Sequence, residues 1–243
     1  MKKCWIFILF ILISASVGAK DYNASLFGIK SNGTTNNTSS IQKAIDYISE
    51  HGGGTLVFYV GRYLTGTVQL KSNVYIMLEE GAVLLGSSSP YDYKNALGMQ
   101  AIIVADGQYN VGISGKGVVK GSGSLLVKNT EKLLAAGYMK TNMKPGLVAF
   151  SNCTNVSVSA LNFWNTAYTA LALTNCKDVR IDGISIDGKN IPSSAGILVT
   201  HCKWVTMQHM FIKVMQQPIT KMNNQNVSIQ HSITDKGTLL SES

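Results

Sequence analysis

The sequence predicts an all-β protein, a right-handed parallel β-helix with three short strands per coil and a capping helix at its N-terminal end. Short apolar strands recur along the second half of the chain at the period of a solenoid. Each repeat contains three strand-like segments in the same order. An amphipathic helix pattern stands before the first repeats. Together these observations indicate one solenoid whose first coil is covered.

The repeat is clearest around the cysteines of the second half of the chain. Cys153, Cys176 and Cys202 each precede a short apolar strand, and Asn224 takes the same place in a weaker copy. The spacings of 23, 26 and 22 residues fall within the period of solenoid coils. More diverged copies begin earlier, at Asn73 and Asn110.

One coil shows the three predicted strands. Residues 196–199, 205–207 and 210–212 are short segments that alternate between apolar and other side chains, or are apolar throughout. Three short strands per coil are typical of a parallel β-helix. A leucine-rich repeat has a similar period, but it needs Leu-x-x-Leu-x-Leu spacing and a helical segment in each unit. The repeats of this sequence contain neither feature.

The cysteines are expected to be structural. Coils stack about 4.8 Å apart, so Cys153, Cys176 and Cys202 should form an internal ladder that Asn224 continues. Buried free thiols pack as small hydrophobic groups, and an odd number of them cannot all pair within one chain. A catalytic or metal-binding role is the alternative, but packing alone explains three thiols at one repeat position. We expect no metal site and no cofactor.

The ends of a solenoid must be covered, because an open coil exposes its core and its strand edges. Ser39 or Ser40 is expected to cap a helix that runs through His51 and ends at the glycines 52–54. Its apolar face consists of Ile41, Ala44, Ile45 and Ile48. No capping segment follows the strand-like residues 238–240. We therefore expect residues 20–243 to form a single β-helix domain that is incomplete at its C-terminal end, or whose last coil pairs with something else.

The first 19 residues predict export. Lys2 and Lys3 precede an apolar run at residues 5–13, and small residues follow up to Ala19. This is the pattern of a secretory signal peptide, with cleavage expected after Ala19. A membrane anchor is the alternative, but the run is about half of the roughly 20 residues that a spanning helix needs. We expect a secreted or periplasmic protein without a membrane span after cleavage.

The composition fits a folded domain that favours acidic partners. Hydrophobic residues make up 45% of the chain, which is enough for a core. The formal charge of +8 becomes +6 without Lys2 and Lys3, so the surface should mildly attract acidic molecules. Nucleic acid is not an expected partner, because the chain is exported and has no Arg-rich run and no zinc-ligand spacing.

Several segments together resemble a known family. They are Phe27–Gly33, Ser40–Asp46, Gly52–Val57, Gly61–Gly66, Leu70–Val74, Leu78–Leu84 and Gly115–Gly121. With these segments the chain resembles the polygalacturonase-like glycoside hydrolases of family 28, in the pectin lyase-like superfamily. The likeness covers nearly the whole mature chain. It implies a protein that acts on galacturonan-type acidic polysaccharide by inverting hydrolysis of glycosidic bonds.

The residues that the resemblance makes catalytic are replaced. Inverting hydrolysis needs two carboxyl groups about 6.5–9.5 Å apart, one as acid and one as base. The family's first acidic motif falls on residues 193–196, where Ala195 replaces its Asp, and its Asp pair falls on Gln216 and Gln217. The family's Gly-His-Gly motif falls near residues 235–237 without its histidine, and its Arg-x-Lys motif would lie beyond Ser243.

The absence of acids can also be read directly from the sequence. No Asp or Glu occurs from Gly188 through Thr234, so three consecutive coils offer neither an acid nor a base. Glutamine cannot transfer a proton at neutral pH, and loss of one acid-base group typically costs 10²- to 10⁴-fold in rate. Three hypotheses follow: a hydrolase that uses a carboxylate elsewhere, such as Asp235; a catalytically inactive protein that binds carbohydrate; or a fragment of a longer enzyme.

We therefore assign no catalytic residues, and the candidate site residues are ones that could bind the substrate. The residues expected to contact an acidic, galacturonan-like polysaccharide are Lys213, Gln216, Gln217, Lys221, Asp235 and Lys236. Lys203, His201 and His209 could extend them into a basic strip, or could be solvated turn residues. Trp164 and Tyr168 could stack on sugar rings or pack in turns. Asp178, Asp182 and Asp187 are expected to be solvated, not to bind calcium.

Overall fold

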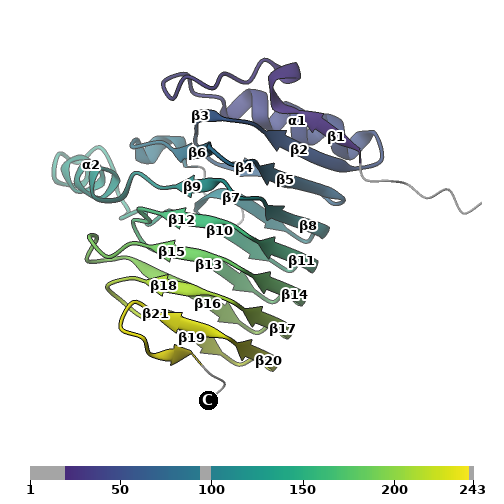
Figure 1. Cartoon of the computed structure of the whole chain (residues 1–243). Coiled ribbons are helices and arrows are strands. Elements are labelled where there is room, and N and C mark those ends of the chain that lie inside the picture. Colours follow the sequence, from purple (N-terminus) through teal and green to yellow (C-terminus); the bar gives the residue numbers. More distant parts are fainter. Residues whose placement is uncertain (1–19, 94–99, 241–243) are drawn as a thin grey trace, which may run out of the picture.

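The computed structural model describes residues 20–93 and 100–240 and forms a right-handed parallel β-helix (Figure 1). Its coils stack from an N-terminal helix to the last strands, and three sheets run along the stack. The predicted signal peptide lies outside the described residues and stays a prediction. Within residues 20–93 and 100–240, no helix has both the length and the apolar character that crossing a membrane requires.

Each coil contributes one strand to each of the three sheets. Sheet A contains, in spatial order, β1 (Asp21–Asn23), β2 (Gly54–Phe58), β5 (Val74–Leu78), β8 (Tyr109–Ser114), β11 (Thr154–Ser159), β14 (Lys177–Asp182), β17 (Lys203–Gln208) and β20 (Gln225–Gln230). Sheet B contains β3 (Gly61–Thr65), β6 (Ala82–Gly86), β9 (Val118–Lys120), β12 (Asn162–Trp164), β15 (Ser185–Asp187), β18 (Phe211–Lys213), β21 (Ser232–Thr234) and β22 (Leu239–Leu240). Sheet C contains β4 (Val68–Gln69), β7 (Ala101–Asp106), β10 (Gly146–Ser151), β13 (Thr169–Thr174), β16 (Ala195–Thr200) and β19 (Ile219–Met222). All neighbours pair in parallel except β21 and β22, which are antiparallel.

The strand register confirms the predicted repeat. In sheet A, Val156 pairs with Val179, Val179 with Val205, and Val205 with Val227. The diverged copy at Val111 joins the same row, because it pairs with Val156. Equivalent residues of successive coils therefore lie directly over one another.

Stacked apolar side chains fill the interior of the coil. In sheet B, Val119, Phe163, Ile186 and Ile212 lie in one row and are buried. Side chains alternate between the two faces of a strand, so each strand sends every second residue into this core. Full burial of one such side chain contributes about 1.5–3 kcal/mol, and each row repeats that contribution in every coil.

The N-terminal end is covered as predicted. Helix α1 (Thr38–Glu50) buries Ile41, Ala44, Ile45 and Ile48, the apolar face expected from the sequence. A short 3₁₀ helix, η1 (Ala24–Phe27), packs beside it. The apolar ends of the first coil are therefore shielded from water.

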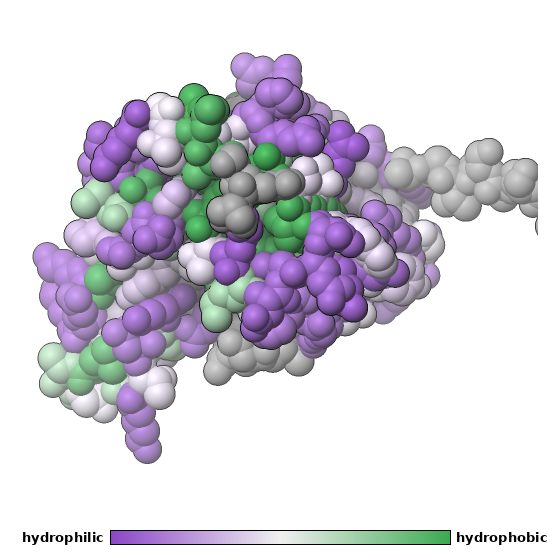
Figure 2. All heavy atoms as spheres, turned by 90° about the horizontal axis from the view of Figure 1, so that it is seen from below, coloured by the Kyte–Doolittle hydropathy of each residue, from purple (hydrophilic) through white to green (hydrophobic). Residues whose placement is uncertain are grey.

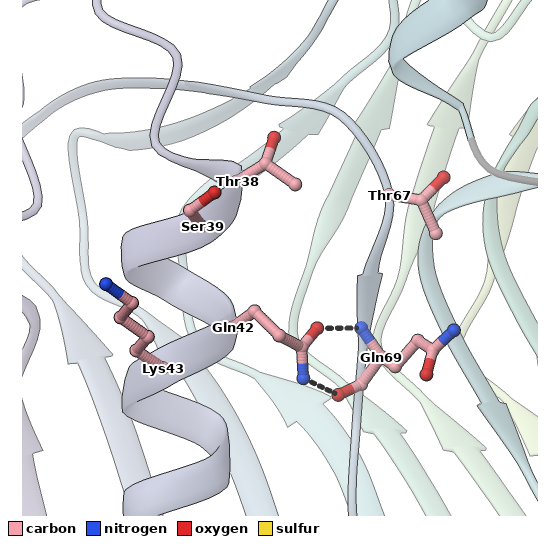
Figure 3. A pocket seen from close by; sticks show the side chains of 6 residues that line it. All are labelled: Thr38, Ser39, Gln42, Lys43, Thr67 and Gln69. Carbon is pink, nitrogen blue, oxygen red and sulfur yellow. Dashed lines mark hydrogen bonds between the residues drawn. The ribbon is translucent and has the colours of Figure 1, made fainter.

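The same end also closes the strand edges of all three sheets. Strand β1 pairs with β2 in sheet A, and Gly33 donates its backbone N–H to Arg62 in β3 of sheet B, at 2.7 Å. In sheet C a side chain covers the strand edge. The amide of Gln42 in α1 accepts the N–H of Gln69 at 2.8 Å and donates to the carbonyl of Gln69 at 3.1 Å (Figure 3). Gln42 thus pairs with β4 as another strand would.

The start of α1 differs from the prediction. The helix begins at Thr38, so Ser39 and Ser40 lie in its first turn and neither caps it. Asn37 holds the cap position, but its side chain is used elsewhere: it accepts the N–H of Lys30 at 2.8 Å and donates to the carbonyl of Leu64 at 3.3 Å. The oxygen of the Asn36 side chain instead accepts the N–H of Thr38, at 3.0 Å.

The cysteine ladder is present and does more than pack. Cys153, Cys176 and Cys202 are free, and each is at most 1% exposed. The Sγ atom of Cys202 accepts the backbone N–H of Cys176 at 3.3 Å, and Oδ1 of Asn224 accepts that of Cys202 at 2.8 Å. Hydrogen bonds to the neighbouring thiols, together with burial, raise the pKa of the Cys176 thiol. Cys202 and Asn224 therefore each serve as the acceptor for a backbone N–H in the coil above.

A second helix was not predicted. Helix α2 (Gly123–Ala135) lies between β9 and β10 and stands beside the coil at the level of β9 and β12 (Figure 1). Leu126 and Thr130 are its buried side chains beyond Gly123, and the apolar Leu133 and Leu134 are half-buried. Their spacing of three to four residues is the signal that could have revealed the helix. A further 3₁₀ helix, η2 (Pro90–Asp92), packs against it.

The last coil differs from the first in how its core is covered. Ile219, Val227 and Leu240 pack against the core but are only half-buried. Viewed from this end, hydrophobic residues gather near the centre of the face and hydrophilic residues surround them (Figure 2). Lys221 pairs with Val199 in sheet C. Because Val199 faces the core and is fully buried, Lys221 stands on the interior side of the last coil.

Substitution of Asn37 tests how the N-terminal cap is held. Asn37 is 2% exposed, and its side chain also donates to the carbonyls of Lys30 and Thr35. An unpaired buried polar group costs about 1–3 kcal/mol, so Asn37→Ala should lower the free energy of unfolding by about 2 kcal/mol. Urea denaturation monitored by circular dichroism measures this loss. Asn190→Ala, at an exposed turn position, is the matched control and should change stability little; equal losses in both variants would contradict the assignment.

Candidate functional site

The predicted site residues lie mainly on one corner of the solenoid, which we call the turn face. It consists of the turns 165–168, 188–194 and 214–218, which join strands of sheet B to strands of sheet C, and of residues 235–238 after β21. Two hollows open on this face. The helix hollow, of about 390 Å³, adjoins α2, and the end hollow, of about 290 Å³, lies in the last described coil.

Side-chain hydroxyl groups tie the successive turns together. Ser193 donates to the carbonyl of Ala167 in the turn above, at 2.6 Å. The Ser194 hydroxyl donates to the carbonyl of Gly188 at 2.7 Å and accepts the N–H of Met215 in the turn below at 3.2 Å. The hydroxyl groups of both serines thus hold the turns in register.

Gln216 is fixed in a similar way. Its side-chain amide donates to the carbonyl of Pro192 at 2.8 Å, and its backbone N–H donates to the carbonyl of Ser194 at 2.9 Å. Gln217 is exposed, and its carbonyl accepts the N–H of Gly196 at 3.0 Å. The two glutamines thus join neighbouring turns, and a glutamine side chain supplies no acid or base.

The end hollow collects three of the predicted substrate-binding residues. Gln216, Asp235 and Lys236 line it, with further polar and apolar residues around them. Asp235 lies 3.5 Å from the Lys189 ammonium, and its side chain keeps 22% exposure. The end hollow thus lies between two successive coils.

The remaining predicted residues do not all lie on the turn face. Lys213 ends β18 at the edge of the turn face, where its ammonium lies 3.4 Å from a carboxylate oxygen of Asp187. Lys221 does not lie on the turn face, because it stands on the interior side of β19 over Val199. The basic strip considered above does not form as one surface. His201 lies between sheets C and A, and His209, between sheets A and B, is bound to Asp182 at 2.9 Å.

The helix hollow contains residues that the sequence did not single out. Lys128 and Glu131 come from α2, Lys144 comes from the segment after it, and Ser193 comes from the turn 188–194. Tyr168 forms part of its wall, and the Lys144 ammonium lies 5.7 Å from the centre of the Tyr168 ring. Burial, and secondarily the Glu131 carboxylate, raise the pKa of Tyr168. The hollow therefore combines an aromatic surface with cations.

Specific contacts hold α2 against the coil. Asn129 donates to the carbonyl of Ser88 at 2.9 Å, and Ser122 donates to the carbonyl of Gly86 at 2.6 Å. At Gly123 the backbone has a φ of +46°, and a Cβ atom would lie 2.5 Å from the side chain of Ile191. The close approach of Gly123 to the turn 188–194 makes α2 a fixed wall of the helix hollow.

The charges on the turn face are unevenly matched. Lys189 with Asp235 and Lys213 with Asp187 form ion pairs. The other charged residues that line the two hollows are three lysines, Lys128, Lys144 and Lys236, and one carboxylate, Glu131. None of these three lysines forms an ion pair with another residue of the described ranges. The face therefore carries excess positive charge, suited to anionic groups.

Within residues 20–93 and 100–240, no group of three potential ligands is arranged for a metal ion.

Relatives among characterised proteins match parts of the chain. Exo-poly-alpha-D-galacturonosidase of Dickeya chrysanthemi is 35% identical over 121 residues, which are 43% of this chain and 20% of that protein. Alpha-1,3-galactosidase B of Bacteroides thetaiotaomicron is 38% identical over 63 residues, 26% of this chain and 10% of that protein. The chain thus spans a fifth or less of the length of these curated relatives.

Solved structures match over most of the chain. A candidate glycosyl hydrolase from Parabacteroides merdae is 37% identical, with a TM-score of 0.86 over 92% of this chain and 100% of that one. The family 28 exopolygalacturonase of Yersinia enterocolitica has a TM-score of 0.79 at 19% identity, over 89% of this chain and 49% of that one, and shows the shared fold. The family model for glycosyl hydrolases family 28 matches residues 57–241. The chain therefore belongs to glycosyl hydrolases family 28.

Proposed function

We propose that this protein is an exported member of family 28 that binds an acidic, pectin-type polysaccharide on the turn face and does not hydrolyse it efficiently by the family's mechanism. The observation that carries the proposal is the exchange of side chains in the turns. Where the family resemblance places acids, the chain has Ala195, directly after the turn 188–194, and Gln216 and Gln217 in the turn 214–218. Cations border the same turns.

Electrostatics supports a polyuronate as the ligand. The paired charges on the turn face cancel, so Lys128, Lys144 and Lys236 dominate the two hollows. A polyuronate presents a carboxylate on each sugar unit and can meet several cations at once. Tyr168, beside Lys144, offers a ring face to a sugar. The names of the relatives, which include a galacturonosidase, agree with this class of ligand.

Hydrolysis of the same polysaccharide is the second candidate function. Membership of family 28 favours it, and so does the carboxylate of Asp235, which lines the end hollow. An inverting reaction would need a second carboxyl group about 6.5–9.5 Å away. No Asp or Glu of the turns between Gly188 and Thr234 can supply it, because none occurs there.

The binding proposal predicts a salt-dependent interaction with polygalacturonate. Lys144→Ala and Lys236→Ala should each weaken binding by up to about fivefold, because one exposed ion pair contributes about 0.2–1 kcal/mol. Raising ionic strength should weaken binding further. Isothermal titration calorimetry with polygalacturonate oligomers measures both effects. Lys116→Ala, at an exposed turn between sheets A and B, is the control and should bind as the parent chain does.

Fully methyl-esterified oligomers sharpen this test. They keep the sugar rings and lose the negative charge, so they should bind more weakly than the free acid at low salt. Equal affinity for both forms, or an equal loss in Lys116→Ala, would refute a turn face that recognises carboxylates.

The proposal also predicts little release of reducing ends. The parent chain and Asp235→Asn, both folded by circular dichroism, should release reducing sugar from polygalacturonate no faster than buffer at high protein concentration. Release by the parent chain that Asp235→Asn abolishes would instead establish the hydrolase, since Asn keeps the shape of Asp235 but cannot carry its proton.

Export is testable independently of the ligand. The chain expressed with all 243 residues in a Gram-negative host should appear outside the cytoplasm with Lys20 as its first residue, because small residues precede that bond. N-terminal sequencing and intact mass measure this directly. Recovery of the chain with Met1 to Ala19 still attached would contradict cleavage at this position.

A further inference from the structure

The interior of the coil holds three reactive groups that the proposed function does not use. Cys153, Cys176 and Cys202 are free thiols in three successive coils. They occupy the same position, the turn that leads from sheet C into sheet A. Each is at most 1% exposed, so they face one another and the core instead of solvent.

The backbone fixes these cysteines in register on both sides. After them, the N–H of Lys177 donates to the carbonyl of Cys153, and that of Lys203 to the carbonyl of Cys176, both at 2.9 Å. Before them, Asn152 and Asn175 donate to carbonyls of the next coil, at 2.9 and 2.8 Å. Neighbouring ladder cysteines are therefore separated by one coil rise, about 4.8 Å.

This separation lies within the Cα–Cα range of disulfides, about 4.4–6.8 Å. Cys153 and Cys202 are two coil rises apart, roughly 10 Å, which is beyond the roughly 7 Å limit for bridging without backbone movement. Cys176 is thus the one member of the ladder that has a partner within reach on each side.

The positions of the sulfur atoms agree with this assignment. The Sγ atom of Cys202 lies 3.3 Å from the backbone nitrogen of Cys176. The thiol of Cys176 reaches the carbonyl of Phe150, in the coil of Cys153, at 3.5 Å, and that of Thr174, in its own coil, at 3.4 Å. The Cys176 thiol therefore lies between its own coil and that of Cys153, and the Cys202 thiol lies toward the coil of Cys176.

We infer that Cys176 forms a disulfide with one of its ladder neighbours when the chain folds under oxidising conditions, which links two coils through the core. In this step two thiols lose two electrons and two protons, and a small-molecule disulfide, such as oxidised glutathione, accepts them and becomes two thiols. The exchange takes place before the coils close, because the folded ladder is buried. The third thiol stays free.

Refolding of the full chain with oxidised and reduced glutathione tests the inference. Differential alkylation followed by peptide mapping counts the ladder thiols and distinguishes them from Cys4. We expect ladder thiols to fall from three to one, with peptides that join Cys176 to Cys153 or to Cys202, and with an unchanged β-sheet circular dichroism spectrum. The urea midpoint of the linked protein should fall when a reductant is added, because a cross-link restricts the unfolded chain.

Matched serine variants decide between this linkage and any other. Cys153→Ser and Cys202→Ser should each still lose two ladder thiols, whereas Cys176→Ser should keep both that remain. Three free ladder thiols in the refolded parent chain would overturn the inference. So would a link between Cys153 and Cys202 in Cys176→Ser, or a linked parent chain that has lost its β-sheet spectrum.

Discussion

The in-register stacking of parallel coils is the constraint on which the rest of this structure depends. The backbone of each coil pairs with the next in three sheets, so a residue and its equivalents form a row along the solenoid. Apolar rows make the core, and asparagines in left-handed conformations near the starts of the sheet A strands, such as Asn110 and Asn155, bond to one another from coil to coil. Each residue of a row must fit the same position in its coil. The thiol of Cys202 accepts the backbone N–H of Cys176 in the coil above, and the amide oxygen of Asn224 accepts that of Cys202.

The same constraint shapes the turn face. In a hydrolase of this family the turns between sheets B and C would present carboxyl groups to a sugar, and such groups must be free to exchange protons. Here Ser193, Ser194 and Gln216 are engaged with backbone groups of the adjacent turns. These side chains join each turn to the next and so stabilise the stack. None of these three side chains is an acid or a base at neutral pH, so their contribution to the turn face is to hold the turns in register.

The sequence predicts repeated features well and single features poorly. The rows of Val156, Val179, Val205 and Val227 could be placed because each position is seen several times at one spacing. Helix α2 occurs once and interrupts the repeat, so no second copy supported it. The cap of α1 was misplaced because the use of Asn37 depends on Lys30 and Leu64, which only the tertiary fold brings near. Lys221 was assigned to the binding residues because its charge suggested the surface, whereas the register places it on the interior side of the coil.

The net charge of the turn face depends on which lysines and carboxylates form ion pairs there. Asp187 and Asp235 each have a lysine beside them, and the intervening coils contain no other carboxylate. Lys128 on α2, Lys144 and Lys236 thus form no ion pair within the described residues. Charge repulsion among them destabilises the folded protein slightly, and an anionic polymer relieves it on binding. A surface with this imbalance gains more from a ligand that carries many carboxylates than from a neutral sugar of the same shape.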